Sequence, residues 1–562
     1  MALIHGLQKG SLRGDFFGGL TAAVVALPLA LAMGVASGAG PLAGLYGAVF
    51  VGFFAALFGG TPAQVSGPTG PMTVVMAAVF TQFTAMYPDD PARGAAMAFT
   101  VVILGGLFQI LFGVLRVGRY INLIPHPVVS GFMSGIGVII ILLQLGPLLG
   151  HLSPPGPLEA ALAVPDLIGQ PVLGALALGV LALLIVYLTP SAINRLMPSP
   201  LLALIVGTLV LLVVGGGGAI DTSGVTATLS GVAVLGPIPS GFPSPQWPVF
   251  ELAHLPDMLK AAVMLATLGT IDSLLTSLVA DNLTRTQHQS DRELIGQGIG
   301  NAVSGLFGGL PGAGATMRTV VNVRVGGRTP VSGMWHALLL LGVLTGAGAI
   351  VQYIPHAVLA GILIKVGTDI IDWDYLRHLR TAPRSGMIIM ASVFFITVFV
   401  DLITAVAVGV IMASLIFVER MSALQIDSIT AVTDPASATP LSADEKALME
   451  QAHGRVLLFH IGGPMSFGAA KGMAGNLARF DEYDVLVLDL SDVPLIDDSA
   501  IRALDDMIHD AQRKERAVLL VSGREAVSTR LDRRGIYRKL AEGAVFAQRK
   551  AALEQAVALL PA

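Results

Sequence analysis

The 562-residue sequence contains no cysteine, which excludes disulfide bonds, cysteine-ligated metal centres and thiol catalysis. Charged residues are also scarce: Asp, Glu, Lys and Arg make up 12% of the chain, against roughly 25% in soluble proteins. With 54% hydrophobic residues and a mean hydropathy of +0.76, the composition indicates a membrane protein. The net charge of −4 argues against a partner that is a nucleic acid.

The few charges are unevenly distributed along the chain. Residues 1–421 hold 34 of the 70 charged side chains, whereas the much shorter stretch 422–562 holds 36. We therefore predict a membrane domain over 1–421, a polar linker over 422–452 and a cytoplasmic domain over 453–562. Within the linker, Asp434 is followed by a stretch rich in proline, serine and threonine.

Fourteen apolar segments are recognisable in the first 421 residues. Several are shorter than the roughly 20 residues that a straight membrane-spanning helix needs. The segments cover 16–37, 41–58, 71–86, 96–115, 127–148, 172–189, 199–215, 258–280, 293–307, 315–323, 331–351, 356–371, 385–403 and 404–419.

Arginine placement predicts the topology of these segments. The long connections 149–171 and 216–256 contain no Lys or Arg, so the positive-inside rule assigns them to the outer side and both termini to the cytoplasm. The arginines of the predicted inner loops are Arg116, Arg119, Arg195, Arg285, Arg292, Arg324, Arg328, Arg377, Arg380 and Arg384. Seven segments in each half put the halves in opposite orientations, which predicts an inverted repeat.

Two stretches interrupt the apolar pattern at corresponding places in the two halves. Residues 58–75 and 307–321 both begin with Phe-Gly-Gly, continue through a segment rich in glycine and proline, and resume as a short Thr/Val helix. Broken backbone at membrane depth is tolerated only where protein or a water-filled cavity satisfies its polar groups. Paired interruptions of this kind indicate the binding site of a transporter.

The broken stretches predict an anion site. A helix that begins inside the membrane directs unpaired N–H groups and a positive dipole end at the adjacent cavity. We expect the anion between the two helix starts, near Thr69 and Gly70 on one side and Ala315 and Thr316 on the other. Arg318, just inside the second helix, adds positive potential there.

Asp272 is the second candidate feature. Placing a carboxylate in the middle of a membrane segment costs free energy, so such a residue is first interpreted as part of a functional site. Thr276 follows four residues later, so both side chains share one helix face. The residues alone leave three interpretations open: a cation site of oxygen ligands, a proton carrier, or a structural ion pair between Asp272 and Arg318.

The C-terminal domain has a different pattern. Short runs rich in valine and leucine at 456–461, 485–490 and 518–521 alternate with stretches of helical spacing at 468–480 and 498–514. This alternation predicts a small α/β domain.

At this point the sequence resembles a known family. Pro41–Ala48, Pro68–Pro71 and Ala360–Lys365 are similar to motifs of the SulP (sulfate permease) anion transporters, and the C-terminal domain resembles the STAS domain shared with anti-sigma-factor antagonists. The resemblance covers nearly the whole chain. It implies an α-helical polytopic fold with fourteen transmembrane segments in a seven-plus-seven inverted repeat, divided into core and gate domains, and a homodimer in the inner (plasma) membrane.

Two further segments, 271–277 and 312–319, are similar to the sodium-dependent bicarbonate transporters of this family. The resemblance implies sodium-coupled bicarbonate uptake through an elevator-like movement, with lipid, sodium and bicarbonate as partners and no other cofactor. It also implies a sodium site, whose ligands would be Asp272, Thr276, Gly314, Ala315 and Thr316.

Two other functions stay open. One is proton-coupled uptake of sulfate or a dicarboxylate by the same fold, and the other is a membrane-tethered signalling protein in which the STAS-like domain does the work. The turn Asp497–Ala500 resembles the phosphorylated turn of anti-sigma antagonists, but Asp498 and Ala500 depart from that pattern, so we expect Ser499 to be a helix N-cap. We find no arrangement of nucleophile, base and orienting group in the sequence and predict no enzymatic activity.

Overall fold

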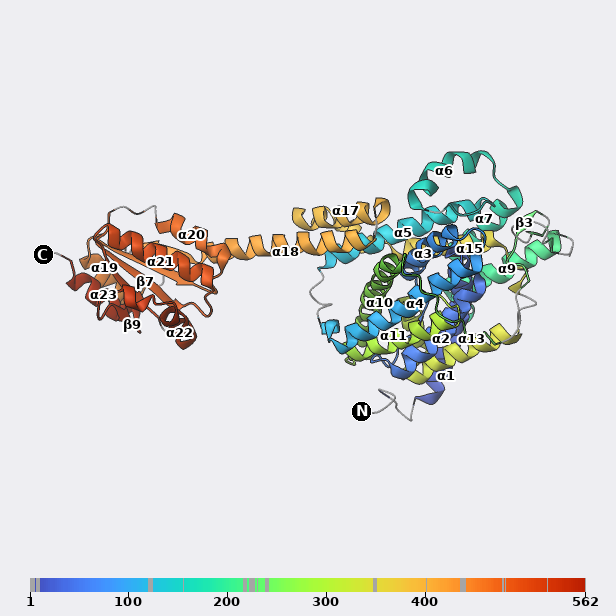
Figure 1. Ribbon diagram of the computed structural model, residues 1–562, viewed down its shortest axis with the longest axis horizontal. Coiled ribbons are helices and arrows are strands. Elements are labelled where there is room, and N and C mark those ends of the chain that lie inside the picture. Colours follow the sequence, from blue (N-terminus) through green and yellow to red (C-terminus); the bar gives the residue numbers. More distant parts are fainter. Residues whose placement is uncertain are drawn as a thin grey trace. The chain divides into compact units, whose positions relative to one another are not determined.

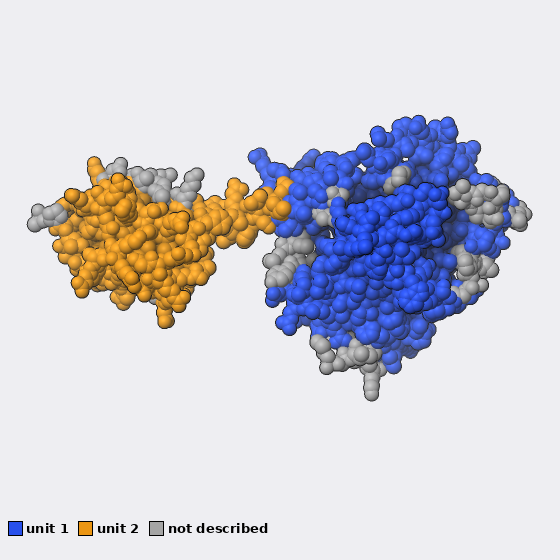
Figure 2. Space-filling view, in the orientation of Figure 1, with its two compact units in different colours: residues 1–410 blue, residues 411–562 orange. Residues whose placement is uncertain are grey.

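A computed structural model of the protein describes residues 6, 11–119, 125–154, 156–215, 220–221, 228–229, 231–237, 242–346, 351–400, 402–434, 441–477, 480, 482–522 and 524–560. The chain divides into two compact units, Met1–Val410 and Ile411–Ala562, which Figure 2 colours separately. The first unit is helical and the second combines helices with a five-stranded sheet.

One group of helices in the first unit packs around the two broken stretches, and we call it the core group. Close approach of small residues holds it together: a Cβ on Gly106 would lie 2.5 Å from the carbonyl oxygen of Gly298, as in the close packing of small residues between membrane helices. Its described helices are α1 (Leu12–Ala36), α2 (Pro41–Phe58), α3 (Gly70–Met86), α4 (Pro91–Val114), α10 (Leu255–Thr284), α11 (Ser290–Leu306), α12 (Thr316–Val325) and α13 (Pro330–Gly346).

The remaining helices of the first unit form the gate group, in which α5 packs against α15 and α17, and α7 against α9 and α15. The described members are α5 (His126–Leu148), α6 (Pro157–Gly169), α7 (Leu173–Leu188), α8 (Ser191–Leu196), α9 (Ser199–Val214), α15 (His356–Ile370), α16 (Trp373–Arg377), α17 (Arg384–Phe399) and the part of α18 (Leu402–Asp427) up to Val410. Strands β2 (Thr228–Leu229) and β3 (Val232–Ala233) form a small hairpin in the connection to α10.

The helices match the predicted membrane segments, since each of the fourteen overlaps a described helix. Among the described residues, six helices are long and apolar enough to cross a membrane alone: α1, α2, α4, α5, α10 and α18. The pairs α6–α7 and α12–α13 meet that criterion together but bend by 115° and 111°. The stretch 149–171, which we predicted to be a loop, contains helix α6.

The inverted repeat is visible where the two halves meet. Strand β1 (Ser66–Gly67) precedes α3 in the first half, and strand β4 (Ala313–Gly314) precedes α12 in the second half. The two strands pair antiparallel, so each repeat contributes one strand and one helix start to the centre of the core group. The prediction of a helical membrane domain built on an inverted repeat is confirmed.

The second unit carries the predicted α/β domain. Its sheet has the order β5-β6-β7-β8-β9, with β5 antiparallel to β6 and the other neighbours parallel. The strands are β5 (Ile429–Val432), β6 (Val456–Gly462), β7 (Val485–Asp492), β8 (Ala517–Val521) and β9 (Val545–Phe546). The helices are α19 (Ala443–Gln451), α20 (Phe467–Leu477), α21 (Asp498–Arg513), α22 (Glu525–Arg533), the 3₁₀ turn Tyr537–Lys539 and α23 (Arg549–Ala558). Side chains of β6 and β7 such as Phe459 and Leu488 are fully buried and form its core.

Two details of the second unit differ from expectation. Much of the stretch 422–452 is structured, because it includes β5 and α19; residues 435–440 of that stretch lie outside the described residues. The N-cap of α21 is Asp497, whose carboxylate accepts a 2.8 Å hydrogen bond from the Ala500 amide. The expectation that Ser499 caps this helix is wrong, because the helix starts one residue before it.

Candidate functional site

The two broken stretches meet directly in the core group. Ser66 pairs with Gly314 and Gly67 with Ala313, and the amide of Ala315 donates a 2.9 Å hydrogen bond to the Val65 carbonyl. This two-stranded ladder satisfies backbone polar groups that a broken membrane helix would otherwise leave unpaired. Residues that lie about 250 positions apart in sequence therefore form one buried unit.

Glycine makes this close pairing sterically possible. A Cβ on Gly312 would lie 2.5 Å from the carbonyl carbon of Gly67, and a Cβ on Gly67 would lie 2.5 Å from Nη1 of Arg318. A side chain at either position would push the strands apart or displace the guanidinium.

Helices α3 and α12 begin immediately after the paired strands. Thr69 is the N-cap of α3 and Ala315 is the N-cap of α12, and neither caps its helix with a side-chain hydrogen bond. The Ala315 amide belongs to the ladder, so the unpaired amides of the second start are those of the next residues, beginning with Thr316. With ten residues, α12 is about 15 Å long, half the thickness of a bilayer core.

The hydroxyl of Thr276 lies within hydrogen-bond distance of two other predicted sodium ligands. The buried hydroxyl of Thr276 on α10 donates to the Gly314 carbonyl at 2.9 Å and lies 2.8 Å from the Thr316 hydroxyl. Ser273, one turn earlier on α10, accepts a 3.1 Å hydrogen bond from the Gly314 amide. Helix α10 therefore holds the strand and the helix start of the second repeat together.

Asp272 lies on the same helix, and its side chain is next to that of Thr69. The Oδ2 atom of Asp272 and the Oγ1 atom of Thr69 are buried and have no hydrogen-bond partner among the described residues. A buried polar atom without a partner is costly, so these two oxygens are where a bound ion or a proton would relieve an unfavourable state.

Arg318 is almost fully buried, with 1% of its surface exposed. Its Nη2 atom donates a 2.8 Å hydrogen bond to the Pro68 carbonyl, directly before the start of α3. The described structure contains no ion pair between Arg318 and Asp272, which contradicts the interpretation of these residues as a structural pair. The guanidinium instead brings a positive charge from α12 to the opposite helix start, and its Nη1 atom has no partner there.

His336 is a polar residue of this region that the sequence did not point to. It lies in α13, is fully buried, and has no hydrogen bond to either ring nitrogen among the described residues. The ring lies within reach of the charge on Arg318. A single histidine in an apolar segment is a weak signal, because it is more often a packed core residue than part of a site.

Helix α11 supports both broken stretches with one polar face, which the sequence analysis also missed. Glu293, Gln297, Asn301 and Ser304 recur at intervals of four and three residues, so they share one side of the helix. Asn301 binds Gly312 twice, accepting from its amide at 2.7 Å and donating to its carbonyl at 3.0 Å. The helical spacing of polar residues in a membrane segment was the available sequence signal.

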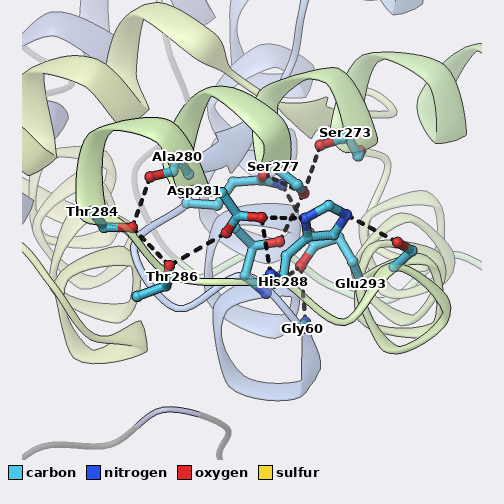
Figure 3. A network of polar contacts seen from close by, with 12 residues as sticks. Gly60, Ser273, Ser277, Ala280, Asp281, Thr284, Thr286, His288 and Glu293 are labelled. Carbon is cyan, nitrogen blue, oxygen red and sulfur yellow. Dashed lines mark hydrogen bonds and ion pairs between the residues drawn. The ribbon is translucent and has the colours of Figure 1, made fainter. Parts of the chain in front are cut away.

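Glu293 holds the stretch that leads into β1. Its buried carboxylate accepts hydrogen bonds from the amides of Gly60 and Thr61, both at 2.9 Å, and from the side chains of Gln64 and Gln297, both at 2.8 Å. Figure 3 shows Glu293 facing Gly60, with residues of α10 beside them. Four neutral donors therefore stabilise one carboxylate.

Three polar side chains at the C-terminal end of α10 form a chain of hydrogen bonds. Asp281 lies 2.7 Å from Nδ1 of His288 (Figure 3), and the Ser290 hydroxyl lies 2.9 Å from Nε2 of the same ring. This is the bonding order of a nucleophile, a base and an orienting group, which the sequence analysis did not find. Asp281 lies in the last turn of α10, His288 in the connection and Ser290 at the first position of α11, so these bonds fix the course of the connection between the two helices.

The start of α3 borders a narrow hollow between the core and gate groups. The hollow is small, with a volume of about 20 Å³, and Gly70 and Thr73 line it from the core side. Ile140 of α5 and Leu363 of α15 line it from the gate side. Of the predicted anion-binding residues, Gly70 is the one that faces this hollow.

Family comparisons cover nearly the whole chain. Residues 12–422 match the sulfate permease family, and residues 447–552 match the STAS domain. The chain is 47% identical over 556 residues to the bicarbonate transporter BicA of Synechocystis sp., a match that spans 98% of this chain and 95% of that protein.

Solved structures agree with this assignment. The transmembrane domain of a cyanobacterial bicarbonate transporter BicA is 50% identical and superposes with a TM-score of 0.65, covering 72% of this chain and all of that domain. Murine Solute Carrier 26 family member A9 is 16% identical with a TM-score of 0.81, over 98% of this chain and 92% of that one, and shows the same fold.

Proposed function

Because the chain belongs to the sulfate permease family of membrane transporters, we propose that it imports bicarbonate together with sodium. The identity of 47% to a protein named as a bicarbonate transporter supports the choice of cargo. The arrangement of the site supports transport over signalling as the main role, because its polar groups are buried where a soluble signalling partner does not reach.

The observation that carries the proposal is the antiparallel pairing of Ser66–Gly67 with Ala313–Gly314. It brings the starts of α3 and α12 together, so two positive dipole ends and the guanidinium of Arg318 act on one region. Backbone amides and threonine hydroxyls suit a small oxyanion. In this proposal Thr69, Gly70, Ala315, Thr316 and Arg318 form the anion site.

Sodium is the coupling ion of this proposal. A hard cation prefers oxygen ligands, and the Thr276 hydroxyl lies 2.9 Å from the Gly314 carbonyl oxygen and 2.8 Å from the Thr316 hydroxyl. The unpartnered Asp272 oxygen adds the negative charge, and the Ala315 carbonyl completes the proposed set. Neutralising Asp272 with sodium leaves Arg318 and the helix starts to attract the anion.

We propose an elevator-type movement for the transport step. The site belongs entirely to the core group, whereas the hollow beside Gly70 lies against the gate group. Moving the core group along the gate group would carry the cargo between the two sides without dismantling the ladder. We further propose a homodimer in the inner membrane, with both termini in the cytoplasm, as the arginine distribution indicates.

Uptake by purified protein in liposomes tests the function. Labelled bicarbonate, sulfate and fumarate are compared, each with an inward sodium gradient and with potassium in its place, and each with and without a proton gradient. We expect bicarbonate uptake that requires sodium. Sulfate or fumarate uptake driven by protons alone would instead establish the proton-coupled alternative, in which Asp272 carries the proton.

A truncation at residue 440 separates transport from signalling. Uptake that survives in the correctly inserted truncated protein supports transport as the main role. Absence of uptake of any tested anion by the intact protein, at a confirmed level of reconstitution, would contradict the proposal.

A further inference from the structure

An open groove lies between α4 and α11, away from the proposed anion site. Helices α4 and α11 run side by side in the core group (Figure 1), and the groove at the end of α4 has a volume of about 670 Å³. Its lining is mostly apolar, with Val114 contributed by α4 and Ile295 and Ile299 contributed by α11.

Three arginines surround this apolar groove. Arg116 and Arg119 follow the last turn of α4 and are exposed, and Arg292 lies in the first turn of α11. Asp291 is the acidic residue of the lining, so the groove carries a surplus of positive charge. All three arginines lie on the side that the arginine distribution assigns to the cytoplasm.

An exposed apolar stripe leads from these arginines along α4. Leu107, Leu111, Val114 and Leu115 recur at helical spacing, and between 45% and 63% of the surface of each is exposed. In a membrane protein such a stripe faces acyl chains. The positive groove therefore continues directly into a surface for hydrocarbon, at the depth where a headgroup joins its chains.

We propose that this groove binds an anionic phospholipid, with the headgroup phosphate at Arg116 and Arg119 and the acyl chains along α4. Basic pockets between membrane helices on the cytoplasmic side are recognised by anionic headgroups, and each arginine near the surface adds to the attraction. A free phosphate would use the arginines but gain nothing from the apolar lining, which is why the occupant is a lipid. The proposal requires only that the first unit lies in a membrane and is independent of the cargo.

The bound lipid lies next to a support of the anion site. Phe58 lines the groove, and its carbonyl accepts a 3.2 Å hydrogen bond from Nε of Arg292. The next residue of α11, Glu293, binds the amides of Gly60 and Thr61. The groove thus borders the chain segment that leads into β1, so the lipid reinforces the packing of α2 against α11.

Native mass spectrometry of the purified full-length protein tests the proposal. The protein is incubated with phosphatidylglycerol or phosphatidylethanolamine, and retained lipid is counted. We expect preferential retention of phosphatidylglycerol and a loss of about tenfold in the variant R116Q/R119Q, given that two surface arginines contribute of the order of a tenfold change or more together. The variant R377Q/R380Q removes two exposed arginines from the same predicted side and should retain the lipid.

A photoactivatable phosphatidylglycerol gives the position of binding. We expect its labels on peptides that cover 107–119 and 289–299, and a loss of these labels in R116Q/R119Q. Equal loss of lipid in R377Q/R380Q, equal retention of both lipids, or labels confined to other segments would each overturn the proposal. Competition by the soluble headgroup glycerophosphoglycerol at concentrations equal to the lipid would also overturn it, because the site would then bind a free phosphate.

Discussion

The hydroxyl of Thr276 donates a 2.9 Å hydrogen bond to the carbonyl oxygen of Gly314, and through it α10 holds the strand that precedes α12 in the second repeat. The same hydroxyl contacts Thr316 at 2.8 Å. One side chain therefore joins the backbone of β4 to the start of α12.

Replacing Thr276 with valine keeps the shape of the side chain but removes this hydroxyl. The Gly314 carbonyl then loses a buried partner, at a cost of about 1–3 kcal/mol. We expect sodium to lose about tenfold in affinity because the proposed site loses one oxygen ligand, and 1.4 kcal/mol corresponds to a factor of ten. Stabilisation of the protein against heat by sodium, compared with potassium, measures this affinity without transport. Thr276→Ser retains the hydroxyl and should behave like the wild type.

Asp272→Asn removes the negative charge of the proposed sodium site without changing its size. We expect bicarbonate uptake to fall at least tenfold and its dependence on sodium to disappear, because the cation loses its charged ligand. Uptake in liposomes at a series of sodium concentrations provides the measurement. Asp257→Asn changes an exposed carboxylate in the first turn of the same helix and is the control. Unchanged sodium dependence in Asp272→Asn would refute the role of this carboxylate.

Glu293→Gln replaces one acceptor oxygen of a carboxylate that receives four hydrogen bonds with an amide donor. Two donors then face each other in a buried place, so we expect a loss of about 1–3 kcal/mol in stability. We also expect slower uptake with sodium affinity retained, because Glu293 positions the backbone before β1 and touches no proposed ligand. The exposed Glu159→Gln serves as the control. A variant as stable as the wild type would show that Glu293 does not hold this segment.

The STAS domain contains a buried carboxylate with a predictable response to pH. Burial raises the pKa of Asp489, but hydrogen bonds from His460 and Ser491 and the charge of Arg549 outweigh it and lower the pKa to about 2. The contacts are 2.8 Å to Nδ1 of His460, 3.0 Å to the Ser491 amide and 2.6 Å to Nε of Arg549. The ionised form is therefore favoured by folding.

The sign of this effect follows from the lowered pKa. Stabilisation is fully present above the unfolded pKa of about 4 and is lost as the pH falls through 2; it amounts to about 2 kcal/mol. We expect the difference in hydrogen-exchange protection of 485–492 between the wild type and Asp489→Asn to shrink from pH 4.5 to pH 2. The exposed Asp444→Asn should show no such difference at strand β7. A difference that is constant with pH would contradict the prediction.

The sequence predicted the elements of the site better than its supports. The paired breaks and the isolated Asp272 are visible as departures from apolar periodicity, and both lie where the structure concentrates unpartnered polar atoms. Residues such as Glu293 and Asn301 were missed, because their partners are backbone groups of Gly60 and Gly312. The spacing of polar residues in α11 predicts that they share one face. It does not predict which backbone groups lie against that face, because this depends on the three-dimensional course of the chain.

The same limit explains the remaining differences. Helix α6 lies in a stretch rich in proline and lacking basic residues, where composition favours a loop. The N-cap of α21 is Asp497 and not the expected Ser499. Both are good capping residues, and only the backbone angles distinguish them. The ion pair expected as an alternative for Asp272 did not form, since Arg318 reaches across to the other repeat.

The polar face of α11 has a mechanical consequence. Its upstream residues hold the stretch before β1 and its downstream residues hold the stretch before β4, so a single helix supports both halves of the proposed site. Neither half can shift without dragging the other. In the proposed transport step the anion, the sodium ion and the core group would then move together as a rigid body, and the conformational change would take place where the core group meets the gate group.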